Sequence, residues 1–167
     1  MYANSQYKFN ERKYTSDIPS EQVYNELNQE TLENIIDQIS GWSNEDENTV
    51  IVIDDFATSL KTKAAIRLIN QICASRRHYK TSIILSVQWL NSISLNMRKQ
   101  INYIIAFKFK NNKELRCVAD EFTKYDYNEF QEIAEYVFDK PYEFMVIDGD
   151  NNRIFKKFNE IQIHTNK

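Results

Sequence analysis

The sequence predicts an α/β fold with a mainly parallel β-sheet, helices on both faces of the sheet and a C-terminal β-hairpin. Three short apolar runs, at residues 50–56, 82–88 and 103–109, alternate with segments in which apolar residues recur at helical spacing. Two later apolar segments, 142–148 and 153–158, flank Gly-Asp-Asn-Asn, a composition typical of a hairpin turn. With 167 residues, 42% of them hydrophobic, the chain is long enough for one domain with its own core.

The N-terminal part predicts an irregular start followed by a helix. Residues 1–19 are polar and show no sustained period, so we expect at most one short strand there. Ser20, which is followed by Glu and Gln, predicts a helix N-cap. Apolar residues recur at helical spacing through 23–39, and Gly41 predicts the end of this helix before an acidic loop at 42–48.

The remaining predicted helices alternate with the apolar runs. Residues 61–79 place alanine, leucine and isoleucine on one helical face and predict the crossover between the first two of these strands. A short helix is expected at 91–100, and two more at about 111–122 and 127–138. No internal repeat or linker is visible, so residues 1–167 are predicted to form a single domain.

The composition excludes several kinds of site and segment. The sequence has two glycines and contains neither G-x-x-x-x-G-K-S/T nor G-x-G-x-x-G, the loops that cradle phosphates. Its two cysteines and two histidines stand apart from one another, so no zinc site is expected. The start is polar, and no apolar run approaches the roughly 20 residues that cross a bilayer. We expect a soluble intracellular protein, and its net charge of −3 argues against a uniformly basic surface.

Two aspartates directly follow the first buried strand. Ionised carboxylates are costly to bury, so a strand that runs into Asp54-Asp55 needs a neutralising partner. Four apolar residues followed by Asp-Asp is the Walker B pattern, in which the first acid, Asp54, binds Mg²⁺ through water. The second acid, Asp55, orients or deprotonates the attacking water. The alternative is an ordinary strand end whose aspartates cap the next helix or face solvent.

A glutamine and two arginines extend this hypothesis. Gln88 ends the next predicted strand, where a neutral amide can bridge the attacking water and the γ-phosphate. Arg77 and Arg98 each precede a predicted strand, and an arginine at a subunit boundary can stabilise transition-state charge on a neighbour's phosphates. The alternatives are a polar strand end for Gln88 and solvated side chains for the arginines. A metal-dependent phosphodiesterase using Asp54, Asp55 and Asp148 is a weaker hypothesis, because no further ligand has persuasive spacing.

These motifs, in this order, resemble the core of the poxvirus-type genome-packaging ATPases, the FtsK–HerA class motors of large DNA viruses and virophages. The resemblance covers roughly residues 17–110. It rests on VIVIDD at the first strand, Arg77-His78 before the second, Gln88 at its end and Arg98 ten residues later.

The resemblance implies a RecA-like P-loop fold, working as a homo-oligomeric ring that drives double-stranded DNA into a capsid. Asp54 would be the Walker B acid that binds Mg²⁺. Asp55 would occupy the position of the catalytic acid, and Gln88 would be the sensor glutamine. Arg98 or Arg77 would be the arginine finger. ATP would be the substrate, and capsid or portal-vertex proteins would be partners. The location would be the host cytoplasm or the virion.

The sequence departs from that family in lacking the Walker A loop, since no Gly-Lys-Ser/Thr triplet occurs in it. Three explanations are open. The half with the P-loop is encoded separately or was removed, or the reading frame starts at an internal methionine. Alternatively, the chain is a degenerate partner that does not hydrolyse ATP. We favour an incomplete RecA-like domain, because the acids, the glutamine and the arginine keep the identities that catalysis needs. These 167 residues alone are then expected to be inactive. The alternative function is a catalytically inactive interaction protein that docks on a motor or capsid component.

Overall fold

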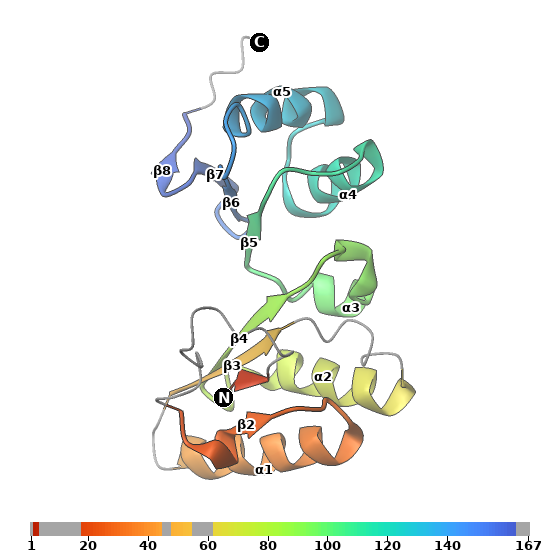
Figure 1. Ribbon diagram of the computed structural model, residues 1–167, viewed down its shortest axis with the longest axis vertical. Helices are drawn as coiled ribbons and strands as arrows, with labels where there is room; N and C mark the ends of the chain where they lie inside the picture. Colours follow the sequence, from red (N-terminus) through yellow and green to blue (C-terminus); the bar gives the residue numbers. More distant parts are fainter. Residues whose placement is uncertain (1, 4–17, 45–47, 55–61, 163–167) are drawn as a thin grey trace. The chain divides into compact units, whose positions relative to one another are not determined.

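The computed structural model describes residues 2–3, 18–44, 48–54 and 62–162 (Figure 1). The chain divides into two compact units, Met1–Gln100 and Ile101–Lys167, and each is described by itself below. Among the described residues, no helix is both long enough and apolar enough to cross a membrane.

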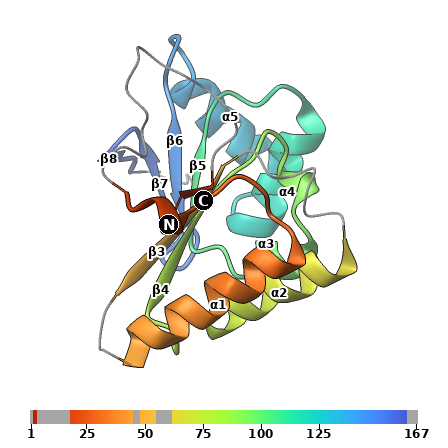
Figure 2. The same cartoon turned by 60° about the horizontal axis from the view of Figure 1, so that its bottom comes forward.

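The first unit contains a parallel sheet of four strands. In sheet order these are β2 (Val23–Tyr24), β1 (Tyr2–Ala3), β3 (Thr49–Asp54) and β4 (Thr81–Ser86), and every neighbouring pair runs parallel. A short 3-10 helix, η1 (Ser20–Gln22), precedes β2. The helices α1 (Gln29–Asn44) and α2 (Lys63–Ser75) lie side by side against the strands (Figures 1 and 2). Another 3-10 helix, η2 (Leu90–Ser92), and the short helix α3 (Leu95–Arg98) follow β4.

The two faces of this sheet differ in burial. Ile51 and Ile53 of β3 are only 3% and 2% exposed, because they face the core formed with the helices. Val50 and Ile84, which point to the other face, are 45% and 56% exposed. Successive side chains of a strand point to opposite faces, which produces this difference. The packing of Ile51 and Ile53 in the core fixes the position of the carboxyl end of β3.

The helix predicted from Ser20 begins later than expected. Ser20 starts only the 3-10 helix η1, whose N-cap residue is Pro19. Asn28 provides the cap of α1, since its side-chain oxygen accepts a hydrogen bond from the backbone N–H of Thr31 at 2.9 Å. Gly41 does not end the helix either. It is exposed within α1, which continues to Asn44, because glycine weakens a helix without forbidding it.

The helix predicted between β3 and β4 is confirmed as α2, which is shorter at both ends than the predicted segment 61–79. The hydroxyl of Thr62 caps α2 by accepting from the backbone N–H of Ala65 at 3.2 Å. Ile69 and Ile72 are buried on its inner face. The helix ends at Ser75, and a turn over residues 76–80 leads into β4.

The second unit contains an antiparallel sheet of four strands and two helices. In sheet order the strands are β5 (Tyr103–Ala106), β6 (Met145–Asp148), β7 (Arg153–Lys156) and β8 (Asn159–Glu160). Helices α4 (Asn112–Phe122) and α5 (Tyr127–Val137) pack against each other (Figure 2). The predicted C-terminal hairpin is confirmed as β6 and β7, and the third predicted strand ends earlier than expected, at Ala106.

Local sequence signals place both helices of this unit. The side chain of Asn111 caps α4 by accepting from the N–H of Glu114 at 2.9 Å. Asp126 and Glu129 form a reciprocal capping box at the start of α5. Phe130 is fully buried, and Met145 of β6 belongs to the same unit's core.

Asp148, at the end of β6, is fully buried but well bonded. Its carboxylate accepts hydrogen bonds from the Asn151 side-chain amide at 2.9 Å and from Arg153 Nη2 at 2.7 Å. The hydrogen bond from the Asn151 side chain contributes most and that from Arg153 comes next, and together they lower the pKa of Asp148 below its usual value. The carboxylate therefore holds the β6–β7 turn in its ionised form.

We expect acid to destabilise the protein partly through Asp148. A carboxyl group whose pKa is lowered by folding stabilises the native state above the unfolded pKa of about 3.9. This contribution is lost as the pH falls from about 5 through the lowered native pKa. Urea denaturation between pH 2 and pH 7 should show a smaller acid-dependent loss in Asp148→Ala, which is less stable at neutral pH. Asp120→Ala, an exposed change on α4, is the matched control. A pH profile of Asp148→Ala equal to that of the parent protein would contradict this role.

Candidate functional site

The carboxyl ends of β3 and β4 lie together at one edge of the parallel sheet. The register pairs Thr49 with Thr81 at the first residues of the strands and Asp54 with Ser86 at the last. The hydroxyls of Thr49 and Thr81 are 2.7 Å apart and hydrogen bonded, which ties the amino ends together. In parallel α/β sheets, ligands bind in the crevice outside the carboxyl ends of the strands. This edge is therefore the candidate site.

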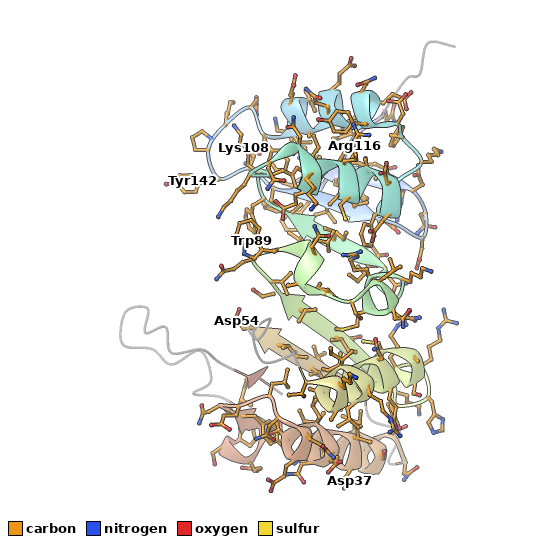
Figure 3. All side chains as sticks on the ribbon, turned by 90° about the vertical axis from the view of Figure 1, so that its right-hand side faces the viewer. Asp37, Asp54, Trp89, Lys108, Arg116 and Tyr142 are labelled. Atoms are coloured by element: carbon orange, nitrogen blue, oxygen red, sulfur yellow. The ribbon has the colours of Figure 1, made fainter. Side chains whose placement is uncertain are left out.

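Asp54 is the acid that the structure places at this edge. It is half-buried, and strand alternation puts its side chain on the same face as Val50 and Val52, away from Ile53 and the helix-covered core. Figure 3 shows Asp54 at the carboxyl end of β3. A half-buried carboxylate at the carboxyl end of a strand suits Mg²⁺, which keeps several of its waters and is held in proteins by one or two carboxylates. The second predicted acid, Asp55, lies outside the described residues.

The predicted sensor Gln88 lies beyond its strand rather than at its last residue. Strand β4 ends at Ser86, and Gln88 is exposed two residues further along the chain. The side chain that lies beside Asp54 in the register is that of Ser86. The sequence-based predictions omitted Ser86, although it is the first polar residue after the apolar run of β4. They also omitted Trp89, which is 48% exposed and directly precedes η2 (Figure 3).

Arg98 is held by its own loop. Its Nη1 donates to the side-chain oxygen of Asn91 at 3.0 Å and to the backbone carbonyl of Ile93 at 3.4 Å. The side chain is half-buried at the end of α3. These bonds position the connection after β4.

Arg77 lies at the opposite end of β4 from Ser86. The backbone N–H of Thr81 donates to the Arg76 carbonyl at 2.8 Å, and that of Thr49 donates to the Lys80 carbonyl at 3.1 Å. The turn that contains Arg77 therefore sits at the amino ends of both strands. Arg77 is exposed there, and the structure does not bring it to Asp54 of the same chain.

The described residues do not assemble a metal cluster of acids. Among them, no group of three or more His, Cys, Asp and Glu side chains could hold an ion. Asp148, which the phosphodiesterase hypothesis requires, is fully buried and bonded to Asn151 and Arg153. Its oxygens are committed to the β6–β7 turn, so that hypothesis loses its third acid.

The fold is that of viral genome-packaging NTPases. The packaging NTPase B204 from Sulfolobus turreted icosahedral virus 2, solved with AMPPCP, matches 86% of this chain with a TM-score of 0.64 and 25% identity. Its complex with AMP matches 85% of the chain with a TM-score of 0.63 and 25% identity. B204 from Sulfolobus Turreted Icosahedral Virus, described as a DNA-packaging ATPase, matches 93% of the chain with a TM-score of 0.63 and 23% identity. The chain is thus a mixed α/β protein with a P-loop NTPase-like packaging ATPase fold.

The sequence comparison then defines the family. The profile of the Poxvirus A32 protein family matches residues 14–121, and the chain belongs to this family. A comparison with curated protein sequences found no match. The chain spans 66% of the length of the B204 chain in the AMPPCP and AMP complexes and 74% of the other B204 chain.

Proposed function

We propose that the chain is the C-terminal catalytic part of an ATP-driven motor subunit that packages viral double-stranded DNA. The observation that carries the proposal is the position of Asp54, at the carboxyl end of β3 and in register with the end of β4. Support comes from membership of the Poxvirus A32 protein family and from the fold shared with B204, which was solved with AMPPCP. We infer a homo-oligomeric ring with capsid or portal-vertex partners, in the host cytoplasm or the virion.

Asp54, Asp55 and Gln88 each have a proposed role. Asp54 would hold Mg²⁺ through water, and Mg²⁺ bound to the nucleotide neutralises the charge that develops on the phosphates. Asp55 would orient or deprotonate the attacking water. Gln88, an exposed amide just after β4, would sense the γ-phosphate without competing for the cation.

The proposal requires a phosphate-binding loop that residues 1–167 do not contain. Backbone N–H groups and a lysine cradle the β- and γ-phosphates in such loops, and the sequence has no Gly-Lys-Ser/Thr triplet. We therefore propose that these residues are an incomplete RecA-like ATPase domain, completed by a segment that carries the Walker A sequence.

Nucleotide binding and hydrolysis, measured on two proteins side by side, test this function. One protein is the 167-residue chain, and the other is the same chain extended by the sequence encoded in frame ahead of Met1. The extended protein should bind Mg-ATP and hydrolyse it, whereas the short one should do neither. An extended protein that contains a Walker A loop and binds no nucleotide would contradict the proposal. That result would favour an inactive protein that docks on a motor or capsid component.

Gln88→Ala should separate binding from turnover. Loss of a group that positions the attacking water lowers kcat by about 10²-fold or more, while ground-state binding of ATP is retained. Equilibrium binding and steady-state kinetics of the extended protein measure the two quantities. Gln71→Ala, an exposed change on α2, is the control, and an unchanged kcat in Gln88→Ala would remove the sensor role.

Arg77→Ala tests which arginine acts on a neighbouring subunit. Because Arg77 is exposed and distant from Asp54 in its own chain, we expect it to act in trans. Arginine fingers contribute about 10³–10⁵-fold to turnover. Rings that mix Arg77→Ala with Asp54→Asn subunits should regain activity, since some interfaces then contain both intact groups. The same mixing with Arg98→Ala is the comparison, because Arg98 is bonded within its own loop. Recovery only with Arg98→Ala would assign the finger to Arg98.

A further inference from the structure

We propose that one end of the sheet in the second unit contacts the phosphate backbone of duplex DNA. The surface consists of the connections β5–α4 (107–111), α5–β6 (138–144) and β7–β8 (157–158), together with the adjoining Lys113 and Lys156, and we call it the lysine surface. The inference rests on the proposed function, and it adds which part of the chain holds the DNA.

Strand pairing brings the three connections together. In the antiparallel sheet the last residue of β5 pairs with the first residue of β6, which pairs with the last residue of β7. The ring centroid of Phe144 lies 6.2 Å from that of Phe107 and 5.3 Å from that of Phe158. The backbone N–H of Lys157 donates to the carbonyl of Phe144 at 2.9 Å. The three connections therefore form one continuous surface.

The lysine surface is positively charged in a chain whose net charge is −3. It contains six lysines and two acids, which give it a net charge of +4. Lysines of the same surface hold both acids, since Asp139 accepts a hydrogen bond from Lys156 Nζ at 2.7 Å and Glu143 pairs with Lys157 Nζ at 2.9 Å. A local excess of one sign of charge attracts ligands of the opposite sign. Nucleic acid is a polyanion that lysines bind through its phosphates.

Most of the lysines on this surface are accessible. Lys108, Lys110, Lys113 and Lys140 are all exposed. Lys113 lies in the first turn of α4, where the helix dipole disfavours a positive charge, so helix stability does not explain its position. Figure 3 shows Lys108 on the same side of the unit as Tyr142 of the α5–β6 connection. One ligand can therefore reach groups from two connections.

Tyr142 also suits a contact with DNA. Its side chain is 95% exposed, so it buries almost no apolar surface within the unit. Its backbone φ of 64° is a left-handed conformation that bulky residues rarely adopt. Neither property contributes to the stability of the fold. Tyrosine hydroxyls and lysines are among the groups that bind DNA phosphates, and this surface presents both.

The chemistry of these groups favours duplex DNA over other polyanions. Contacts to phosphates carry no sequence information, as a motor that packages a whole genome requires. The duplex carries one negative charge per about 1.7 Å of its axis, so a short segment of it can neutralise several lysines together. A single strand would instead be held by stacking of its bases on aromatic rings such as that of Phe158, which is 83% exposed. An acidic protein is the other competitor for the lysines.

Binding of a fluorescent duplex of about 20 base pairs, two helical turns, to the 167-residue chain tests the inference. Lys108→Ala and Lys140→Ala should each weaken binding about threefold or more. Each should also reduce the slope of log affinity against log salt by about 0.9, the contribution of one phosphate contact. Lys124→Ala, the matched control, should change neither quantity. Lys124 is exposed at the opposite end of the same sheet, where its backbone N–H donates to the Asn152 side chain in the β6–β7 turn at 3.0 Å.

Tyr142→Phe separates hydrogen bonding from charge. It should weaken duplex binding about fivefold and leave the salt slope unchanged, because the hydroxyl that it removes is neutral. Two duplexes of different sequence should bind with equal affinity, since only the backbone is contacted. Thermal unfolding of each variant checks that the fold is intact.

Four results would overturn the inference. They are no duplex binding by the parent chain at low salt, and salt slopes that are unchanged in Lys108→Ala and Lys140→Ala. The third is tighter binding of a single strand that is lost in Phe158→Ala, which would favour base stacking. The fourth is displacement of the duplex by polyglutamate at an equal concentration of charge, which would favour an acidic protein partner.

The outcomes also separate this inference from the proposed function. An extended protein that hydrolyses ATP while its duplex binding is unaffected by Lys108→Ala and Lys140→Ala would overturn the lysine surface and leave the function standing. Duplex binding that depends on both lysines, in an extended protein that contains a Walker A loop and binds no nucleotide, would support the surface and count against the function.

Discussion

Asp54→Ala is expected to lower the ATP turnover of the extended protein about 10³-fold, since a bound metal ion contributes several kcal/mol of transition-state charge stabilisation. Asp54 ends a six-residue strand whose register with β4 is set along its whole length. Loss of the carboxylate would leave that strand intact, because the side chain is half-buried on the face away from the helices. The expected result is therefore a folded protein that has lost its chemistry.

Asp37→Ala is the matched control for this experiment. Asp37 is an exposed acid on α1, remote from the end of β3 (Figure 3). The Asp37→Ala change therefore removes the same charge as Asp54→Ala, but away from the candidate site. Steady-state turnover and thermal unfolding should be measured together for the parent protein and both variants. Undiminished turnover in Asp54→Ala would remove the assignment of this carboxylate to the magnesium–nucleotide site. Equal loss in Asp37→Ala would indicate a general effect of charge.

Ile53→Ala is expected to reduce the free energy of unfolding by about 2–5 kcal/mol, the usual cost of truncating a buried isoleucine to alanine. Ile53 is 2% exposed and precedes Asp54 directly. The cavity would open in the core between β3 and the helices. Because β3 presents Asp54 at its end, the same change should also lower ATP turnover of the extended protein. Urea denaturation at neutral pH measures the loss of stability.

Val52→Ala is the control for Ile53→Ala. It lies one residue earlier in β3, on the opposite face, and is only half-buried. Its cost should be the smaller of the two, since less apolar surface leaves the core and no closed cavity forms. A Val52→Ala variant that loses as much stability as Ile53→Ala would mean that the second face of the sheet is already covered.

Much of the fold could be predicted because the type of each longer element follows from a local sequence pattern. The β-branched run of β3 and the helical spacing of α2 indicated their element types directly. Gly-Asp-Asn-Asn between two apolar segments predicted the β6–β7 hairpin. The start of α1 was predicted wrongly at Ser20, because Ser20 and Asn28 are both acceptable caps. The choice of Asn28 depends on which turn of helix packs against the sheet.

The candidate site was predicted less completely than the fold. Polar residues after apolar runs identified Asp54 and the region of Gln88, since the point where a buried strand meets solvent is visible in the sequence. The side chain beside Asp54 is nevertheless that of Ser86. The bonds of Arg98 to Asn91 and Ile93 were not foreseeable, because they depend on how the loop after β4 folds back.

The sequence by itself determined the type of the longer elements, such as β3, α2 and the β6–β7 hairpin, and which acid ends β3. Both follow from the periodicity and polarity of neighbouring residues. Only the tertiary structure decided the register of β3 and β4, which pairs Asp54 with Ser86, and the position of Arg77 at the opposite end of β4. The physical reason is that strand pairing joins residues far apart in the chain, so no local pattern specifies which residues lie side by side.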